Sequence, residues 1–173
     1  MMQSFPLNFR RAFIWLGRLG LGGTFIYAGY SKLFLPNLIL RPLFALRFSL
    51  SANLDGFTRQ VASYELLSPA GASFVAHTLP FAEIMLGLLL LIGWRLRIWA
   101  SLVSLILLGF LGVVTRAYLL HMDINCGCFA TPEPLTGWTV VRDTAFAAFA
   151  ILLTVFAFQE ARAAHPWTAP QKD

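Results

Sequence analysis

Four apolar segments, each long enough to cross a lipid bilayer as a helix, dominate this sequence. They cover about residues 12–34, 73–93, 98–120 and 138–158. A membrane-spanning helix needs roughly 20 predominantly apolar residues. Only 12% of this chain is charged, against about a quarter in ordinary soluble domains. The sequence therefore predicts an all-α membrane protein, a four-transmembrane-helix bundle that forms one domain over residues 1–173. A typical soluble enzyme, a disordered tail and a secreted disulfide scaffold are excluded.

The loop between the first two apolar segments carries a helical pattern of its own. Its apolar residues recur at three- and four-residue spacing, with polar residues between them: Leu54, Phe57, Val61 and Tyr64. This pattern predicts an amphipathic helix over about residues 54–67 that lies on the membrane surface. We expect Ser68-Pro69 to end this helix, and residues 160–173 to form a flexible C-terminal tail.

The basic residues predict how the bundle is oriented in the membrane. An even number of spans places both termini on one side, and the basic residues of that side lie in short tails and in the turn 94–97. Short loops rich in Lys and Arg usually face the cytoplasm. We therefore expect both termini in the cytoplasm and the loops 35–72 and 121–137 outside. This orientation accounts for the formal net charge of +5 without a nucleic-acid partner, because no basic stretch alternates with exposed aromatic residues.

Ionisable side chains inside the apolar segments are candidates for a structural or functional role, because an unpaired charge there is costly. Arg18 lies in the first segment and Glu83 lies midway along the second, and we predict that they form an intramembrane ion pair. The pair either fixes the register of the two helices or belongs to a proton or quinone site. His77 lies near the outer end of the second segment and is either a hydrated interfacial residue or a proton carrier.

The chain has two cysteines, Cys126 and Cys128, and both lie in the outward-facing loop after the third segment. Gly127 between them permits the tight bend that a disulfide over one intervening residue needs. A bridge of this kind is expected to be strained and easily exchanged. We therefore predict a dithiol/disulfide couple in this loop, with Cys126 as the attacking sulfur.

Charged residues near the two cysteines are predicted to assist this chemistry. Arg142 and Arg116 are expected to stabilise a thiolate, and so is the start of the last helix, where Asp143 follows Arg142. Asp123 and His77 are candidate proton carriers, because both lie on the same side of the membrane as the cysteines.

Three other roles for the cysteines stay open. The pair can clip the third and fourth helices together, or the two residues can be free thiols without a function. The pair can also carry a soft metal such as Cu(I) or Hg(II), with His121 and Asp123 nearby. A zinc site is disfavoured because it needs four ligands, so no resident metal is predicted.

Several motifs resemble, in this order along the chain, those of the MauE/DoxX group of redox-associated membrane proteins. They are Tyr-Ala-Gly-Tyr-Ser-Lys-Leu at 27–33, Val-Ala-Ser-Tyr-Glu-Leu-Leu-Ser-Pro at 61–69, Leu-Pro-Phe-Ala-Glu at 79–83, Asp-Ile-Asn-Cys-Gly-Cys-Phe at 123–129 and Arg-Asp at 142–143. The resemblance covers about residues 12–158. The chain departs from the group at Ala130, where the group usually has glycine, and in a stretch of extra residues at about 37–54.

The resemblance implies a four-helix bundle in the inner (cytoplasmic) membrane of a bacterium, with the Cys-Gly-Cys loop facing the periplasm. It also implies a thioredoxin-fold periplasmic partner and a role in maturing disulfide-rich periplasmic proteins, such as the small subunit of methylamine dehydrogenase. Because the chain has no second cysteine pair, electrons must pass to a quinone in the bundle, to a partner chain or across a homodimer. The predicted function is a thiol–disulfide oxidoreductase or an accessory to one. The alternatives are soft-metal trafficking and a non-catalytic membrane scaffold.

Overall fold

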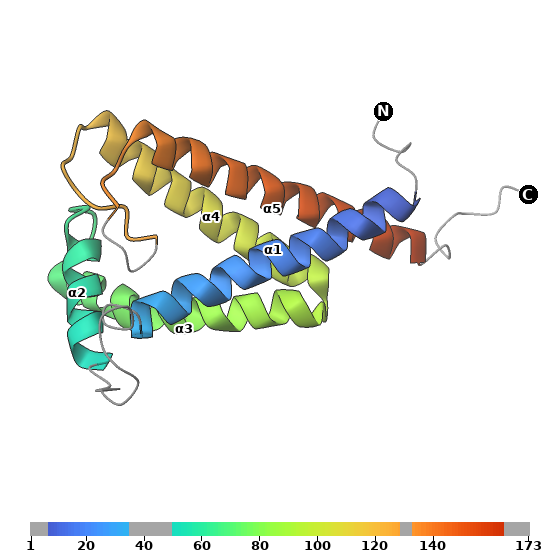
Figure 1. Ribbon diagram of the computed structural model, residues 1–173, viewed down its shortest axis with the longest axis horizontal. Helices are drawn as coiled ribbons and strands as arrows, with labels where there is room; N and C mark the ends of the chain where they lie inside the picture. The colour runs from blue at the N-terminus through green and yellow to red at the C-terminus, as the bar shows by residue number, and fades with distance from the viewer. Residues whose placement is uncertain (1–6, 35–49, 129–132, 165–173) are drawn as a thin grey trace, which may run out of the picture.

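The computed structural model describes residues 7–34, 50–128 and 133–164. Over these residues the chain is all-α, as predicted, apart from one isolated bridge between Asn125 and Pro134. Its five helices are α1 (Leu7–Phe34), α2 (Leu50–Ala62), α3 (Pro69–Ile92), α4 (Leu96–Leu119) and α5 (Gly137–Ala164). The four long helices form a bundle, and the short helix α2 lies across one end of it (Figure 1).

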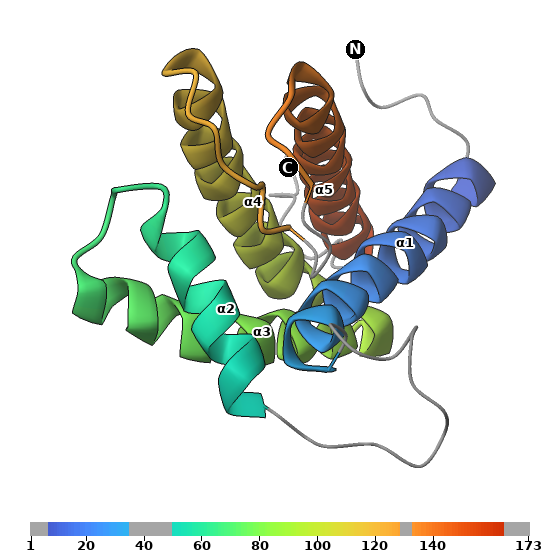
Figure 2. The same ribbon diagram turned by 60° about the vertical axis from the view of Figure 1, so that its left-hand side comes forward.

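The bundle consists of two closely packed antiparallel pairs of helices. α1 packs against α3 and α4 packs against α5, and these contacts are more extensive than those between the pairs. Figure 2 shows α4 and α5 side by side, with α3 below them and α1 crossing α3 and rising to the right of α5. α1 begins and α5 ends at one end of the bundle, whereas α2 and the loop between α4 and α5 gather at the other end (Figure 1).

Close packing of α1 on α3 depends on glycine. A Cβ added to Gly29 would lie 2.4 Å from the carbonyl oxygen of Pro80, and one added to Gly87 would lie 2.7 Å from the carbonyl oxygen of Gly22. Both distances are too short for a carbon atom, so only glycine lets the two backbones approach this closely. These contacts fix the register of the pair, with residue 29 facing residue 80 and residue 22 facing residue 87.

A single hydrophobic cluster joins all four long helices in the half of the bundle where α1 begins. Its buried members are Ile14, Leu21, Phe25, Leu86, Leu90, Ala100, Val103, Ala150, Leu153 and Phe156. α2 supplies none of these members, so the cluster does not extend to the end of the bundle near α2. The candidate site lies at that end.

The outer surface of the long helices suits a lipid environment. Among the described residues, α3, α4 and α5 are long and apolar enough to cross a membrane. They expose large apolar side chains, for example Phe74, Ile92 and Leu105, each more than two thirds exposed. α1 has 28 residues and is long enough to span, but its four basic residues dilute its apolar character. The membrane character is therefore clear, whereas the fourth span stays a prediction.

The Ser68-Pro69 step has the opposite role from the one we expected. The side chain of Ser68 accepts a hydrogen bond from the backbone N–H of Gly71, and Pro69 is in the first turn of α3. This combination is a helix start, so α3 begins earlier than the predicted 73. The preceding helix, α2, covers Leu50–Ala62 instead of about 54–67, because the chain turns at Glu65, whose φ is 53°.

The C-terminal end of the described chain also differs from the prediction. α5 continues to Ala164, so residues 160–164 are helical and do not belong to a tail. The remainder of the predicted tail, most of the stretch at 37–54 and Ala130 lie outside the described residues.

Candidate functional site

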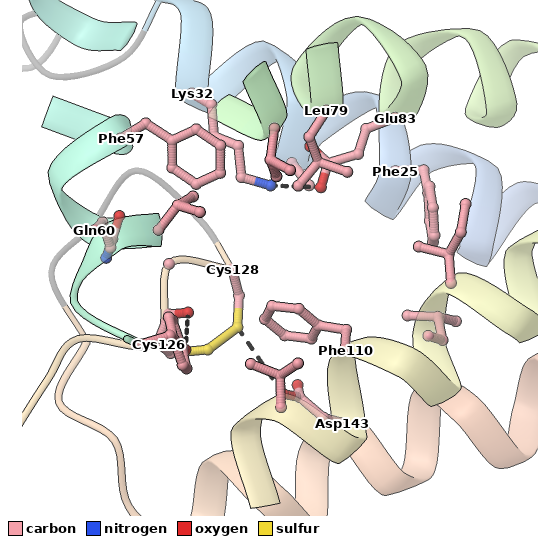
Figure 3. A pocket seen from close by; sticks show the side chains of 18 of the residues that line it. Phe25, Lys32, Phe57, Gln60, Leu79, Glu83, Phe110, Cys126, Cys128 and Asp143 are labelled. Carbon is pink, nitrogen blue, oxygen red and sulfur yellow. Dashed lines mark hydrogen bonds and ion pairs between the residues drawn. A yellow bond between two sulfur atoms is a disulfide. The ribbon is translucent and has the colours of Figure 1, made fainter. Parts of the chain in front are cut away.

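The two cysteines lie at the end of the bundle that α2 covers. The Sγ atoms of Cys126 and Cys128 are joined in a disulfide, and the two Cα atoms are 5.5 Å apart (Figure 3). Gly127 between them has a φ of 74°, a left-handed conformation that favours glycine. A Cβ at Gly127 would lie 3.1 Å from the side chain of Gln60, so α2 packs closely against the bend.

Backbone hydrogen bonds within the loop hold the disulfide in place. The N–H of Cys126 donates to the carbonyl oxygen of Glu133 over 2.9 Å, and the N–H of Leu135 donates to the carbonyl oxygen of Ile124 over 3.0 Å. The two cysteines are not equally accessible. Cys126 is 1% exposed, whereas Cys128 is only half-buried, so an incoming thiol reaches Cys128 more easily.

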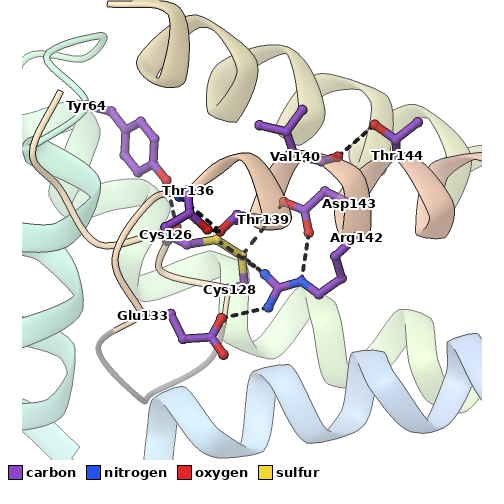
Figure 4. Close-up of polar contacts among 10 residues, drawn as sticks. All are labelled: Tyr64, Cys126, Cys128, Glu133, Thr136, Thr139, Val140, Arg142, Asp143 and Thr144. Atoms are coloured by element: carbon purple, nitrogen blue, oxygen red, sulfur yellow. Dashed lines mark hydrogen bonds and ion pairs between the residues drawn. A yellow bond between two sulfur atoms is a disulfide. The ribbon is translucent and has the colours of Figure 1, made fainter. Parts of the chain in front are cut away.

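Tyr64 fixes the bend from the side of α2. Its hydroxyl donates a hydrogen bond of 2.6 Å to the carbonyl oxygen of Cys126 (Figure 4). Burial, together with the negative charge of Asp143, raises the pKa of Tyr64 from 10.0 to about 12, so the hydroxyl stays protonated and keeps donating at neutral pH. Arg116, predicted to act on a thiolate, instead donates to the backbone carbonyl of Tyr64 over 3.4 Å. It contributes to this support and does not contact sulfur.

Arg142, in the second turn of α5, lies against both sulfur atoms. Its Nη2 is 3.1 Å from Sγ of Cys128 and 3.6 Å from Sγ of Cys126. Two carboxylates hold the guanidinium in this position: Nη1 donates to Glu133 over 2.6 Å, and Nε donates to Asp143 over 3.3 Å (Figure 4). A guanidinium at this distance favours the thiolate form of either cysteine once the disulfide opens.

Asp143 completes the polar cluster on the other side of the disulfide. Its Oδ2 lies 4.0 Å from Sγ of Cys128, and the residue is 6% exposed. In the reduced protein this oxygen can accept the proton of the Cys128 thiol. Cys126, Cys128 and Asp143 also place three ligand atoms within 4.8 Å of one another, a set that can hold a metal ion. The cationic side chain of Arg142 beside the sulfur atoms opposes such an ion.

A second polar pair lies inside the bundle, between α1 and α3. Nζ of Lys32 is 2.5 Å from Oε1 of Glu83, and the two side chains are 4% and 13% exposed. The ammonium group also lies 5.2 Å from the ring centre of Phe57 on α2. Oε2 of Glu83 is buried and has no hydrogen-bond partner among the described residues.

The predicted ion pair between Arg18 and Glu83 is therefore wrong. Arg18 donates instead to the carbonyl oxygens of Leu90 and Leu91, over 3.1 Å and 2.5 Å. The glycine contacts explain this difference, because their register places residue 18 opposite the end of α3. The last carbonyls of a helix have no partner within the helix, and a basic side chain satisfies them.

A cavity of about 320 Å³ joins the disulfide to the Lys32–Glu83 pair. Apolar and aromatic side chains from α1 to α5 form most of its wall. Figure 3 shows Cys126, Cys128 and Asp143 on one side of it and the Lys32–Glu83 pair on the opposite side. The site is thus one space with the Cys126–Cys128 disulfide at one wall and a buried ion pair at the other.

The two predicted proton carriers lie away from this space. His77 is exposed on α3, and its Nδ1 is 2.8 Å from the carbonyl oxygen of Ser73 in the preceding turn. Asp123 is exposed in the loop after α4. Neither residue lines the cavity that joins the disulfide to the Lys32–Glu83 pair.

The structure brings together one part of the predicted site and adds residues that the sequence did not indicate. Four predicted residues meet at the disulfide: Cys126, Cys128, Arg142 and Asp143. Three further residues were not predicted as part of the site: Tyr64, Glu133 and Lys32. In the sequence, Tyr64 is one of the regularly spaced apolar residues, Lys32 is part of a motif at the end of a helix, and Glu133 is a loop residue. None of these sequence positions indicates a functional residue before the fold is known.

Comparison with known proteins gives one match. A family model described as methylamine utilisation protein MauE matches residues 10–156, which include the whole candidate site. No curated protein and no solved structure matches the chain.

Proposed function

Because this chain belongs to the MauE family of methylamine utilisation proteins, we propose that it is a membrane thiol–disulfide redox protein with an accessory role in that process. Its Cys126–Cys128 pair exchanges electrons with a thioredoxin-fold partner or with disulfides of periplasmic proteins. The contact of Arg142 with both sulfur atoms carries this proposal. Neither a structural clip nor an inert cysteine pair needs a guanidinium held against the sulfur atoms by two carboxylates.

The exposure of the two sulfur atoms suggests the course of the exchange. A thiolate of the partner attacks Sγ of Cys128, the more accessible cysteine, and forms a mixed disulfide with it. The bond between the sulfur atoms breaks, and Cys126 leaves as a thiolate that Arg142 stabilises at 3.6 Å. A second thiol of the partner then attacks the partner's own sulfur in the mixed disulfide. A disulfide forms within the partner, the mixed disulfide breaks, and Cys128 leaves as a thiolate. This order replaces our expectation that Cys126 is the attacking sulfur, because Cys126 is 1% exposed.

The proposed orientation places all four long helices across a bacterial inner membrane, with both termini in the cytoplasm. α1 begins and α5 ends at one end of the bundle. The loop between α4 and α5, which carries the disulfide, lies at the opposite end, beside α2 (Figure 1). In this orientation the basic turn 94–97 faces the cytoplasm, as short basic loops usually do. α2 lies at the outer surface of the bilayer, and the half-buried Cys128 is accessible from the periplasm.

Thiol trapping in intact cells tests the function and the orientation together. A membrane-impermeant maleimide of added mass is applied with and without prior reduction, beside single and double Cys→Ser variants. We expect labelling only after reduction, and a mixed disulfide with a thioredoxin-fold protein in Cys126→Ser, which retains the accessible Cys128. Labelling without reduction would contradict an oxidised pair. Full complementation of a deletion strain by the double Ser variant would instead favour a non-catalytic scaffold.

A second candidate function is the transfer of a soft metal, supported by the three donor atoms of Cys126, Cys128 and Asp143. It predicts a bound Cu(I) or Hg(II) ion in protein purified under reducing conditions, lost in Cys126→Ser. Metal content at the level of the Ser variant excludes this function. Redox exchange is favoured over it because the guanidinium of Arg142, 3.1 Å from Sγ of Cys128, is positively charged and repels a metal cation beside the sulfur atoms.

A further inference from the structure

The cavity between the disulfide and the Lys32–Glu83 pair has the features of a ligand site. Its volume of about 320 Å³ lies within the range of small-molecule pockets, which is roughly 300–1,000 Å³. Aromatic side chains from different helices line it, among them Phe25, Phe57, Phe110 and Phe146. Since these helices pack in an apolar bundle, the ligand must be largely apolar and soluble in the membrane.

The wall formed by α1 and α3 supplies polar groups for such a ligand. Lys32 has three donor hydrogens, one of which bonds to Glu83. Oε2 of Glu83 is buried and lacks a hydrogen-bond partner among the described residues. A buried carboxylate oxygen without a partner is costly, and both residues line the cavity. A ligand with a polar oxygen at this wall accepts a hydrogen bond from Lys32, and once reduced it donates one to Glu83.

The opposite wall supplies a two-electron donor. The reduced Cys126–Cys128 pair can lose two electrons and two protons, and the chain has no further cysteine to receive them. The acceptor must therefore be another molecule. A lipid acyl chain would fill the apolar space, but it takes no electrons and leaves the Lys32–Glu83 wall without a polar partner. A quinone has an apolar ring and tail, an oxygen at each end of the ring, and the capacity for two electrons and two protons.

We propose that this cavity binds a membrane quinone, with one carbonyl oxygen at Lys32 and Glu83 and the other at the Cys126–Cys128 pair. The proposal deepens the thiol–disulfide function and rests on it. In the reaction the two thiols form the disulfide and give up two electrons and two protons, and the quinone takes up all of them to become a quinol. Asp143 receives the proton of the Cys128 thiol and passes it to the near oxygen. The ammonium group of Lys32 protonates the far oxygen and regains its proton from the second thiol, so both protons of the quinol come from the cysteine pair, and the new hydroxyl donates to Glu83. Electrons thus run from the partner's thiols through the cysteine pair to the quinone.

Purified full-length protein in nanodiscs allows binding and reduction to be measured separately. The probe is decylubiquinone, a short-tailed quinone. Its binding to the oxidised protein is measured by equilibrium dialysis, and its reduction by the prereduced protein is followed by absorbance. Reduced bacterial thioredoxin serves as the probe for thiol exchange. The variant is the double substitution Lys32→Met and Glu83→Gln, which leaves no single buried charge unpaired. Asp123→Asn, an exposed position outside the cavity, is the matched control.

We expect the native protein and the Asp123→Asn control to bind the quinone and to reduce one quinone per cysteine pair. The double Lys32/Glu83 variant should bind it about tenfold or more weakly, because a hydrogen bond to a charged group is lost, and should still exchange with thioredoxin. A double Cys→Ser variant should bind the quinone and not reduce it. This variant separates occupancy of the cavity from electron transfer.

Two outcomes would overturn the quinone site and leave the proposed function standing. In the first, native protein exchanges with thioredoxin but does not bind or reduce the quinone, and only lipid occupies the cavity. In the second, the double Lys32/Glu83 variant binds and reduces the quinone as the native protein does. Failure of thioredoxin exchange in native protein that still binds quinone would instead count against the proposed function.

Discussion

The hydroxyl of Tyr64 donates a hydrogen bond to the backbone carbonyl of Cys126 over 2.6 Å, joining the turn after α2 to the bend that carries the disulfide. The turn that follows α2 is thereby tied directly to the backbone beside the sulfur pair. The bond acts on the backbone and not on the sulfur atoms, so it positions the cysteines without taking part in their chemistry.

Loss of this bond should loosen the bend. In Tyr64→Phe the carbonyl oxygen of Cys126 loses its side-chain donor, which should cost about 1–3 kcal/mol in the free energy of unfolding. The disulfide should also be reduced faster by dithiothreitol, because the buried Cys126 becomes more accessible. Thermal unfolding and timed thiol titration measure the two effects. Unchanged reduction kinetics in a destabilised variant would assign Tyr64 to the fold alone.

The same bond predicts a dependence on alkaline pH. The pKa of Tyr64 rises from 10.0 in the unfolded chain to about 12 in the folded protein. Folding therefore favours the protonated hydroxyl, and the stability that it contributes is fully present below pH 10 and lost as the pH rises through about 12. Thermal unfolding of native protein and Tyr64→Phe should differ by a constant amount up to pH 10, and the difference should shrink above that. A difference that starts to shrink near pH 8 would contradict this assignment.

Arg142 should control how readily Cys128 reacts. In a Cys126→Ser background, replacing Arg142 by Met removes the cation 3.1 Å from Sγ of Cys128. The rate of iodoacetamide alkylation at pH 7 should fall about tenfold or more, since a nearby opposite charge favours the ionised form of the thiol. Arg142→Lys should retain part of the rate. Arg116→Met, which does not touch sulfur, is the matched control and should react at the parental rate.

The Lys32–Glu83 pair should show strong energetic coupling. Lys32→Met or Glu83→Gln alone leaves a buried group without its partner, and each should cost about 3–5 kcal/mol. The double variant should recover most of that loss. A double-mutant cycle on thermal unfolding in detergent measures the coupling. Additive losses from the two single changes would mean that the two groups do not stabilise each other.

Two glycines of α1 should differ in how well they tolerate alanine: Gly29, which contacts α3, should not tolerate it, whereas Gly23 should. Gly29→Ala places a methyl carbon 2.4 Å from the carbonyl oxygen of Pro80, so the helices must separate, at a cost of about 1–3 kcal/mol. Gly23 has no atom within 4 Å of the added carbon. Gly23→Ala should be neutral or stabilise the helix, because alanine has the higher helix propensity. Unfolding midpoints of the two variants test the difference directly.

The parts of the site that could be predicted from the sequence are those fixed over a short stretch of chain. Cys126, Gly127 and Cys128 are adjacent, and the positive φ of Gly127 is a local requirement that the sequence expresses directly. Arg142 and Asp143 follow at the start of the next helix, close enough in the chain to be expected near the sulfur atoms. The all-helical membrane character is likewise local, because it depends on the length and composition of each apolar segment.

The parts that could not be predicted depend on how distant helices meet. Whether Arg18 or Lys32 reaches Glu83 is decided by the register of α1 on α3. The contacts of Gly29 with Pro80 and of Gly22 with Gly87 set that register, and no pattern within one helix expresses it. The role of Ser68-Pro69 could not be predicted for another reason. A serine followed by proline occurs both after the end of a helix and at the start of one, so the sequence alone does not say which of the two helices it belongs to.

The bundle divides into two tightly packed pairs of helices. Packing of α1 against α3 and of α4 against α5 is extensive and holds each pair together. The cavity lies between the pairs, where contacts are sparser, so a change in the spacing of the two pairs would alter its size while each pair stays packed.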